Sequence, residues 1–127
     1  MESEILVVDD SAAIRKILQR VLRQTGIAIS TIHEAGDGQE ALEVMKNHPV
    51  SLVLTDINMP KMDGIQFLAA VRGSPAWHAV PVVMITTEGG ETKVAEAVRL
   101  GASGYVRKPF TAEQIKEKLS VVMELAS

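Results

Sequence analysis

Residues 52–60 run Leu52-Val53-Leu54-Thr55-Asp56-Ile57-Asn58-Met59-Pro60. The first half is a short, continuous apolar run, which is typical of a strand buried on both faces of a parallel sheet. The run stops at Asp56, and residues that favour turns follow it: Asn58, Pro60, Asp63 and Gly64. The pattern predicts a carboxylate at the C-terminal end of a buried strand, where open α/β sheets bind their ligands.

Length and composition limit the possible classes of protein. A chain of 127 residues fits one domain, expected over residues 1–127. The absence of cysteine excludes disulfides and thiolate metal sites, and residues 1–4 lack the basic start of a secretory signal. A net charge of −3 argues against non-specific nucleic-acid binding, and no apolar stretch approaches a membrane span. We therefore expect a cytoplasmic protein with neither a nucleic acid nor a membrane as partner.

Four further segments have the composition of strands. Residues 5–8 form a buried run that ends at the pair Asp9-Asp10, and residues 29–34 form a weaker one. Residues 81–86 begin with a proline at the position that strands permit and end at Thr86. Residues 104–107 are followed by Lys108.

Segments with one apolar face separate these strands and predict helices. Ser11 is expected to cap the first helix, and Thr111 with Gln114 to form a capping box before the last. The side chains expected on the apolar helix faces are Ile14, Ile17, Leu18, Val21, Leu22, Ala41, Leu42, Met45, Ile65, Leu68, Val71, Val94, Ala97, Val98, Ile115, Leu119, Val122 and Met123.

Alternation of five strands with five helices predicts a parallel α/β sheet with right-handed crossovers. The first, third and fourth strands are the most apolar and should be central, which the strand order 2-1-3-4-5 of the flavodoxin-like, doubly wound class satisfies. In that order the side chains that follow the strand ends meet at one edge of the sheet: Asp9, Asp10, Asp56, Thr86 and Lys108.

Three carboxylates gathered at one place would repel one another unless a cation joined them. Oxygen ligands without cysteine or a neighbouring histidine suit Mg²⁺, with Mn²⁺ able to substitute. His33, His48 and His78 are scattered along the sequence, lack the spacing of metal ligands and are expected to be separate surface residues. A carboxylate beside such an ion can act as a nucleophile and form an aspartyl phosphate, with Lys108 and Thr86 contacting the phosphoryl oxygens.

Four motifs carry a resemblance to a known family. They are Val7-Val8-Asp9-Asp10-Ser11, Thr55-Asp56-Ile57-Asn58-Met59-Pro60-Lys61-Met62-Asp63-Gly64, Ile85-Thr86-Thr87-Glu88 and Gly101-Ala102-Ser103-Gly104-Tyr105-Val106-Arg107-Lys108-Pro109-Phe110. From Glu4 to about Leu125 the chain resembles the receiver domain of two-component response regulators, most closely the single-domain chemotaxis type.

The resemblance implies a phosphoacceptor role for Asp56, which would take a phosphoryl group from a histidine kinase or a phosphotransfer protein. Asp10, Asp56 and the backbone carbonyl of Asn58 would bind Mg²⁺ directly, and Asp9 would bind it through water. Asn58 and Glu88 would border the path of the hydrolytic water and set the lifetime of the phosphorylated form.

The resemblance also implies a switch. Thr86 and Lys108 would contact the phosphoryl group, and the Lys108–Pro109 peptide bond would be cis. Movement of Thr86 would let Tyr105 turn inward, which would reshape the surface of the fourth helix, fifth strand and fifth helix for an unidentified downstream protein.

Two departures from the chemotaxis pattern stand out. Ile57 occupies the place of a tryptophan, and the single tryptophan is Trp77, before the fourth strand. We therefore predict that Mg²⁺ quenches intrinsic fluorescence only weakly. Gly89 and Gly90 replace basic residues next to the expected partner surface.

Three alternatives remain at the level of sequence. A Mg²⁺-dependent phosphatase or mutase would usually carry a second aspartate two residues after the nucleophile, where this chain has Asn58. A flavin-binding module would want a loop rich in Ser, Thr and Gly where the chain has Asp9 and Asp10. The chain could also be the receiver portion of a larger regulator or hybrid kinase.

Overall fold

The computed structural model describes residues 3–86 and 91–126, within which five strands and five helices alternate along the chain. The strands are β1 (Ser3–Val8), β2 (Ile29–Ala35), β3 (Leu52–Asp56), β4 (Val82–Thr86) and β5 (Gly104–Arg107). The helices are α1 (Ala12–Gln24), α2 (Gly38–Asn47), α3 (Gly64–Arg72), α4 (Glu91–Arg99) and α5 (Ala112–Ala126). The predicted order of elements is confirmed.

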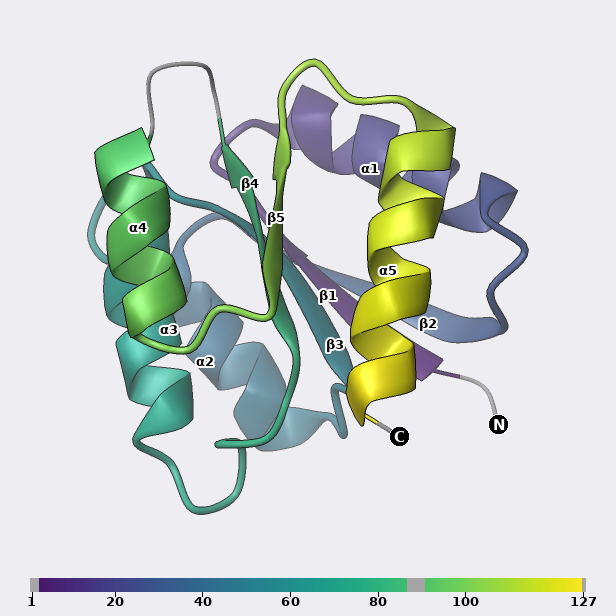
Figure 1. Ribbon diagram of the computed structural model, residues 1–127. Helices are drawn as coiled ribbons and strands as arrows, with labels where there is room; N and C mark the ends of the chain where they lie inside the picture. The colour runs from purple at the N-terminus through teal and green to yellow at the C-terminus, as the bar shows by residue number, and fades with distance from the viewer. Residues whose placement is uncertain (1–2, 87–90, 127) are drawn as a thin grey trace.

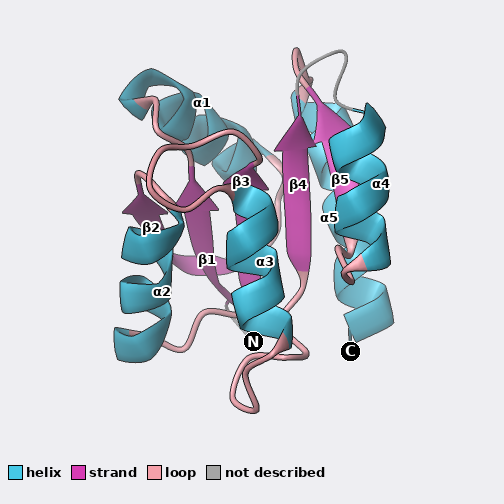
Figure 2. Cartoon of the chain, turned by 90° about the vertical axis from the view of Figure 1, so that its left-hand side faces the viewer, coloured by secondary structure: helices cyan, strands magenta, loops and turns pink. Residues whose placement is uncertain are grey.

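The strands form one parallel sheet in the order β2-β1-β3-β4-β5. Every residue of β3 and β4 is buried, as are the last four of β1, which matches their position inside the sheet. This confirms the predicted strand order and its basis, because continuous apolar runs are needed where helices cover both faces. Figure 2 shows the strand arrows pointing the same way.

Two helical layers cover the sheet: α2, α3 and α4 on one face, α1 and α5 on the other (Figure 1). Side chains of β1 alternate between the two cores that result, as a strand requires. Leu6 and Val8 pack in the core under α2 and α3, whereas Ile5 and Val7 pack in the core under α1 and α5. The site described below therefore stands on strands that are held from both sides.

Two predicted core positions are wrong. Ile17 is 46% exposed on α1, and Val98 is 55% exposed on α4. Each helix buries a narrower apolar face than expected. Successive residues turn by about 100° around the helix axis, so the neighbour of a buried residue can face solvent. In α1 the buried side chains are Leu18 and Leu22, one turn apart, and Ile17 lies on the flank.

The predicted caps are confirmed. The Ile14 N–H donates to the Ser11 hydroxyl at 3.3 Å. Thr111 and Gln114 exchange hydrogen bonds of 2.9 and 3.1 Å before α5. Such caps satisfy N–H groups that lack a partner inside the helix.

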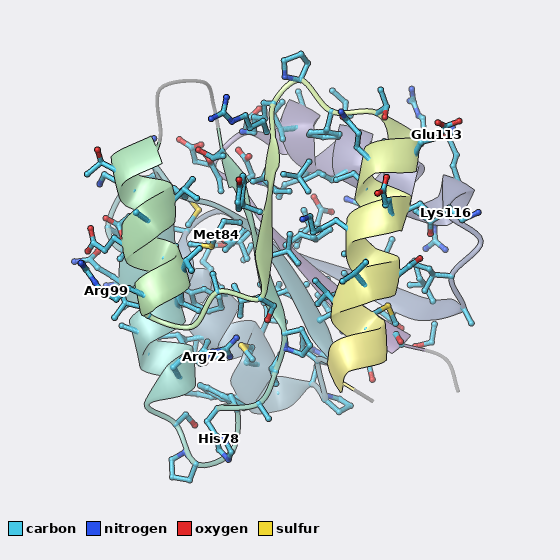
Figure 3. The ribbon with its side chains drawn as sticks, viewed as in Figure 1. Arg72, His78, Met84, Arg99, Glu113 and Lys116 are labelled. Carbon is cyan, nitrogen blue, oxygen red and sulfur yellow. The ribbon has the colours of Figure 1, made fainter. Side chains whose placement is uncertain are left out.

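Arg72, which no sequence pattern singled out, ties together the segment that precedes β4 and the segment that precedes β5. Its guanidinium donates to the carbonyls of Val80 at 2.6 Å and Gly101 at 2.9 Å. Figure 3 shows Arg72 beside the segment that carries His78. Burial lowers the pKa of Arg72. Within the described residues no helix is both long and apolar enough to cross a lipid bilayer.

Candidate functional site

Four parallel strands deliver polar side chains to one edge of the sheet. Asp56 is the last residue of β3 and Thr86 the last of β4, while Asp9 and Asp10 follow β1 and Lys108 follows β5. The register pairs Val8, the last residue of β1, with Thr55 of β3, and Thr86 with Arg107 at the ends of β4 and β5, so the C-terminal ends of the strands lie within about one residue of one another. The sheet therefore brings together residues that are far apart along the chain.

The centre of the site is an acidic cluster. One carboxylate oxygen from each of Asp9, Asp10 and Asp56 lies within 4.8 Å of the others. Asp9 is 1% exposed and Asp56 is 8% exposed, whereas Asp10 is exposed. The cluster thus has a buried floor and one side open to solvent.

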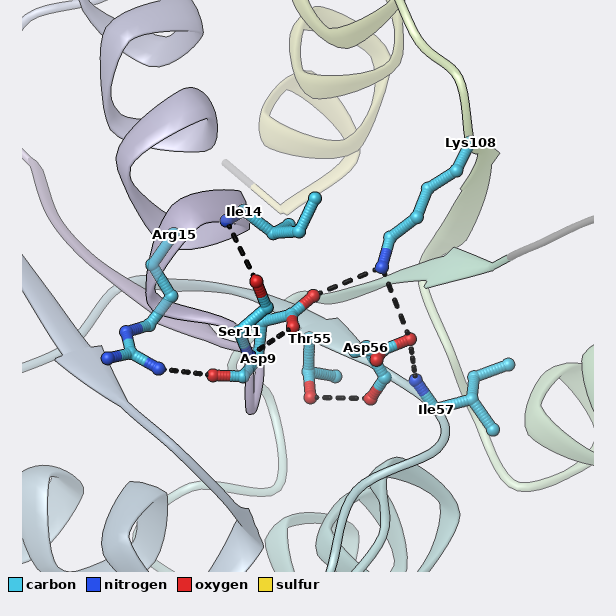
Figure 4. Close-up of polar contacts among 8 residues, drawn as sticks. All are labelled: Asp9, Ser11, Ile14, Arg15, Thr55, Asp56, Ile57 and Lys108. Atoms are coloured by element: carbon cyan, nitrogen blue, oxygen red, sulfur yellow. Dashed lines mark hydrogen bonds and ion pairs between the residues drawn. The ribbon is translucent and has the colours of Figure 1, made fainter.

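Lys108 supplies a cation to this cluster (Figure 4). Its Nζ donates to Asp9 Oδ2 at 3.1 Å and lies 3.7 Å from Asp56 Oδ1. The Lys108 side chain is partly shielded, so water screens these charges less than it would at an open surface. The sequence placed Lys108 at this edge, and the structure adds that its shorter contact is with Asp9.

Asp56 is held in an environment that opposes its charge. Burial raises the pKa of Asp56, and the neighbouring charges of Asp9 and Asp10 raise it further. The Lys108 ammonium and the N–H of Ile57 lower this pKa, but they do not fully compensate. A further cation beside Asp56 would therefore favour its ionised form.

Local hydrogen bonds fix the two buried carboxylates. The Ile57 N–H donates to Asp56 Oδ1 at 2.8 Å. The Ser11 N–H donates to Asp9 Oδ1 at 2.9 Å, and Arg15 donates to the Asp9 backbone carbonyl. Arg15, which the sequence analysis missed, is itself held by Glu34, since its Nε donates to Glu34 Oε1 at 2.9 Å.

The start of α3 touches the end of β3 so closely that only glycine fits. A Cβ on Gly64 would lie 2.3 Å from the Asp56 carbonyl oxygen, and the Gly64 N–H donates to the Ile57 carbonyl at 2.8 Å. The sequence identified Gly64 only as a turn residue. Its role in positioning the backbone of Asp56 required the tertiary structure.

Other predicted site residues lie around this centre. Thr86 is 4% exposed, and its carbonyl accepts a 2.7 Å hydrogen bond from the Lys108 N–H. The Lys108–Pro109 bond is cis. Asn58 is exposed in the loop after β3. Glu88 lies outside the described residues, as do Gly89 and Gly90.

Tyr105 points outward. Tyr105 lies on β5 and is 42% exposed, and Lys118 Nζ lies 5.7 Å from the centroid of its ring. The sequence predicted that Tyr105 can turn inward, and the structure shows its outward position.

The donor set fits a hard divalent cation. The three clustered side chains offer only carboxylate oxygens, which Mg²⁺ and Mn²⁺ prefer. The open side next to Asp10 leaves access for water or for a phosphoryl oxygen. The arrangement therefore combines a buried carboxylate, a cluster of oxygen ligands that could hold a metal ion, and a lysine cation.

The expectation about the histidines is partly wrong. His33 and His48 are not separate, because their ring centroids lie 4.2 Å apart, and His33 also contacts Glu4. Parallel packing brings β2 and the end of α2 together, which the spacing in sequence does not reveal. His78 remains an exposed residue.

Fold and site together define a doubly wound α/β protein with an acidic, lysine-bearing site at the C-terminal edge of its sheet. The family model described as response regulator receiver domain matches residues 5–120, and the chain belongs to this family.

Relatives match over nearly the whole chain. The chain is 38% identical to a chemotaxis protein CheY homolog of Campylobacter jejuni over 98% of its length and 95% of the relative's. It is 40% identical to chemotaxis protein CheY1 of Helicobacter pylori, covering 94% and 96%. The solved structure of chemotaxis response regulator CheY4 of Vibrio cholerae aligns with a TM-score of 0.85 at 34% identity, covering 96% and 99%.

Proposed function

We propose that this protein is the phosphoacceptor of a two-component pathway and carries the phosphoryl group on Asp56. One observation carries the proposal: Asp56 is buried beside Asp9 and Asp10, with Lys108 Nζ 3.7 Å from its carboxylate. The donor is the phosphohistidine of a histidine kinase or phosphotransfer protein. Membership in the receiver family supports this assignment.

The chemistry requires one bond to form and one to break. A carboxylate oxygen of Asp56 bonds to phosphorus while the P–N bond to the donor imidazole breaks, and the imidazole keeps the electron pair. The Lys108 ammonium lies where it can neutralise charge on the transferred group. An ionised carboxylate is already nucleophilic and needs no general base.

Asp10, Asp56 and the Asn58 backbone carbonyl are the proposed ligands of Mg²⁺, with Asp9 contacting it through water. When bound, the ion offsets negative charge on the carboxylates and the phosphoryl oxygens. The clustered carboxylates and the raised pKa of Asp56 support this assignment, because both call for a cation.

The proposed output is a change in the surface formed by α4, β5 and α5. Thr86 and Lys108 contact the phosphoryl group, and Tyr105 then moves from its exposed position toward the space beside β4. Met84 of β4 pairs in register with Tyr105, which supports coupling between these neighbouring strands. An unidentified protein reads the new surface.

The family assignment does not favour the phosphatase alternative. A phosphatase with an aspartate nucleophile would usually carry a second aspartate two residues later, where this chain has Asn58. The protein acts as a signal carrier, and the proposed finer property is that it assists its own phosphorylation and dephosphorylation. A cytoplasmic location remains a prediction, as does the absence of nucleic-acid and membrane partners.

Labelled acetyl phosphate tests the proposal, with and without Mg²⁺. We expect label on the wild-type protein only with Mg²⁺, and none on Asp56→Asn. The matched control is Asp63→Asn, because Asp63 caps α3 and an amide can replace it in that role. Label on Asp56→Asn equal to that on the wild-type protein would overturn the assignment.

Asn58 and Glu88 are proposed to tune the lifetime of the phosphorylated form. Replacing Asn58 by alanine should change the rate of label loss several-fold, because the residue borders the route of the attacking water. Lys46→Gln, on the exposed face of α2, is the control and should leave this rate unchanged. Unchanged decay in Asn58→Ala and Glu88→Ala alike would show that neither residue has this role.

A further inference from the structure

A second cluster of metal-ligating side chains lies away from the phosphoacceptor. Glu4, His33 and His48 each offer one ligand atom, and these atoms lie within 4.8 Å of one another. A ring nitrogen of His33, Nε2, lies 2.8 Å from Glu4 Oε1, and the two imidazole rings are tilted by 31° at a centroid distance of 4.2 Å. The three residues come from separate elements, so their meeting is a property of the fold.

The neighbouring strands place Glu4 and His33 on one face of the sheet. The register pairs Glu4 with Thr31 and Leu6 with His33. Because side chains alternate along a strand, Glu4 and His33 are diagonal neighbours on the same face as Leu6. Leu6 belongs to the core beneath α2 and α3, so this face is the one that α2 covers.

The segment after α2 brings the third side chain to this pair. His48 is the C-cap of α2, and its carbonyl accepts the Val50 N–H at 2.9 Å. The N–H and hydroxyl of Ser51 both donate to the Glu4 carbonyl, at 2.9 and 3.1 Å. These bonds anchor the chain between α2 and β3 onto β1, which holds His48 over Glu4 and His33.

The chemistry of this trio differs from that of the acidic cluster. Two imidazole nitrogens and one carboxylate oxygen form a ligand set that suits Zn²⁺, with a fourth position left for water. Tetrahedral ligands at the usual Zn²⁺ bond lengths lie about 3.3 Å apart, so small side-chain rotations would complete the geometry. The cation would also lie near the C-terminal end of the α2 dipole, which favours positive charge.

Exposure of the three side chains allows an ion to enter. The His33 side chain is 13% exposed, that of Glu4 is 24% exposed, and His48 is exposed. Two ligands are thus held by the packed sheet, and the third can swing to close the site.

We propose that Glu4, His33 and His48 form a binding site for a divalent transition-metal ion of the Zn²⁺ type. The site goes beyond the phosphoacceptor function and is separate from it. Glu4 lies near the start of β1 and Asp9 follows its end, a separation of about 16 Å at the usual rise per residue. A bound ion would cross-link β1, β2 and the segment after α2, and would therefore stabilise the folded chain.

The test is titration of the whole protein with ZnCl₂ in competition with a chromophoric chelator. Excess Mg²⁺ is present throughout to occupy the acidic cluster. We expect one Zn²⁺ per chain and an affinity at least about tenfold lower in His48→Gln, because even partners outside the ligand set change affinity by 10–100-fold. His78→Gln removes an exposed imidazole elsewhere and should bind as the wild-type protein does.

Two further measurements make the result decisive. Zn²⁺ should raise the thermal midpoint of unfolding of the wild-type protein and of His78→Gln, but not that of His48→Gln. Co²⁺ should give the visible absorption of a tetrahedral site in the wild-type protein and in His78→Gln only. Glu4→Gln repeats the comparison with a second ligand if His48→Gln folds poorly. Equal affinity in all variants, or loss of binding only in Asp56→Asn, would overturn the proposal.

Discussion

The behaviour of this protein at the scale of single residues centres on the burial of Asp56. Its carboxylate ends a strand inside the sheet and faces two other acids, with the Lys108 cation as partial compensation. Burial is the main cause of its raised pKa. A divalent cation beside these carboxylates would reduce their mutual repulsion and favour the ionised form of Asp56.

Asp56→Asn should make the metal-free protein more stable at neutral pH. Because the pKa of Asp56 is raised, the folded state binds its proton more readily than the unfolded state does. The resulting stabilisation is complete below the usual pKa of 3.8 and is lost as pH rises through the higher pKa of the folded state.

Urea unfolding of both proteins in metal-free buffer measures this effect. The gain of Asp56→Asn over the wild-type protein should be larger at neutral pH than in acidic buffer below the usual pKa of 3.8, because the raised pKa of Asp56 keeps the wild-type carboxyl mostly protonated there. Added Mg²⁺ should narrow the difference at neutral pH by binding only the wild-type site tightly. A variant less stable than the wild-type protein at neutral pH would contradict the prediction.

At the scale of elements, the function depends on how strands and helices meet. The end of β3 and the start of α3 approach so closely that the Gly64 Cα faces the Asp56 carbonyl without room for a side chain. Asp63 caps the same helix by a reciprocal hydrogen-bond pair with Gln66. The loop between β3 and α3, which contains Asn58, is therefore held at both ends.

Gly64→Ala should destabilise the protein by about 1–3 kcal/mol, the usual cost of forcing extra volume into a packed contact. The added Cβ would meet the Asp56 carbonyl at 2.3 Å, so β3 and α3 must separate. The rate of labelling by acetyl phosphate should fall as well, because the carboxylate moves with its backbone. Urea unfolding and the labelling assay measure the two effects.

Gly36→Ala is the matched control for this substitution. A Cβ there would meet the end of the flexible Glu40 side chain at 3.1 Å, which can rotate away. We expect a change in stability within about 0.5 kcal/mol. If both variants lost the same stability, the close contact at Gly64 would not be the cause.

At the scale of the whole molecule, the acidic cluster and the cluster of Glu4, His33 and His48 lie toward opposite ends of the sheet. Asp56 lies at the C-terminal edge, whereas Glu4 and Trp77 lie toward the other end, since Trp77 precedes the start of β4. The core beneath α3 and α4, against which Trp77 packs, fills the space between. An ion at one end should therefore have little direct effect on reporters at the other.

Binding of Mg²⁺ should quench the intrinsic fluorescence only weakly, because Trp77 is remote from Asp56. Titration of the wild-type protein with MgCl₂ measures this. A Trp77→Phe, Asn58→Trp double variant carries its reporter in the exposed loop beside Asp56 and should respond strongly. Strong quenching in the wild-type protein would mean that a change at the site reaches the far end of the sheet.

Sequence patterns predicted most of the fold and the candidate site. The runs around Leu54 and Val83 are apolar on every position, which requires cover on both faces and so a central place in a parallel sheet. The polar residues that follow each run then fall at one edge whatever the details of packing. Predictions were weaker for the buried faces of helices, as the exposed Ile17 and Val98 show. The apolar pattern of a helix does not say how much of its surface the sheet will cover.

What the sequence determined by itself is the alternation of elements and which strands are central, since these follow from local periodicity. Combined with the known strand order of the flavodoxin-like class, this predicted the gathering of Asp9, Asp56 and Lys108. Only the tertiary structure decided the contact of Gly64 with Asp56 and the meeting of Glu4 with two histidines. Such contacts depend on distances across elements that are far apart in the chain. Local sequence patterns do not predict those distances.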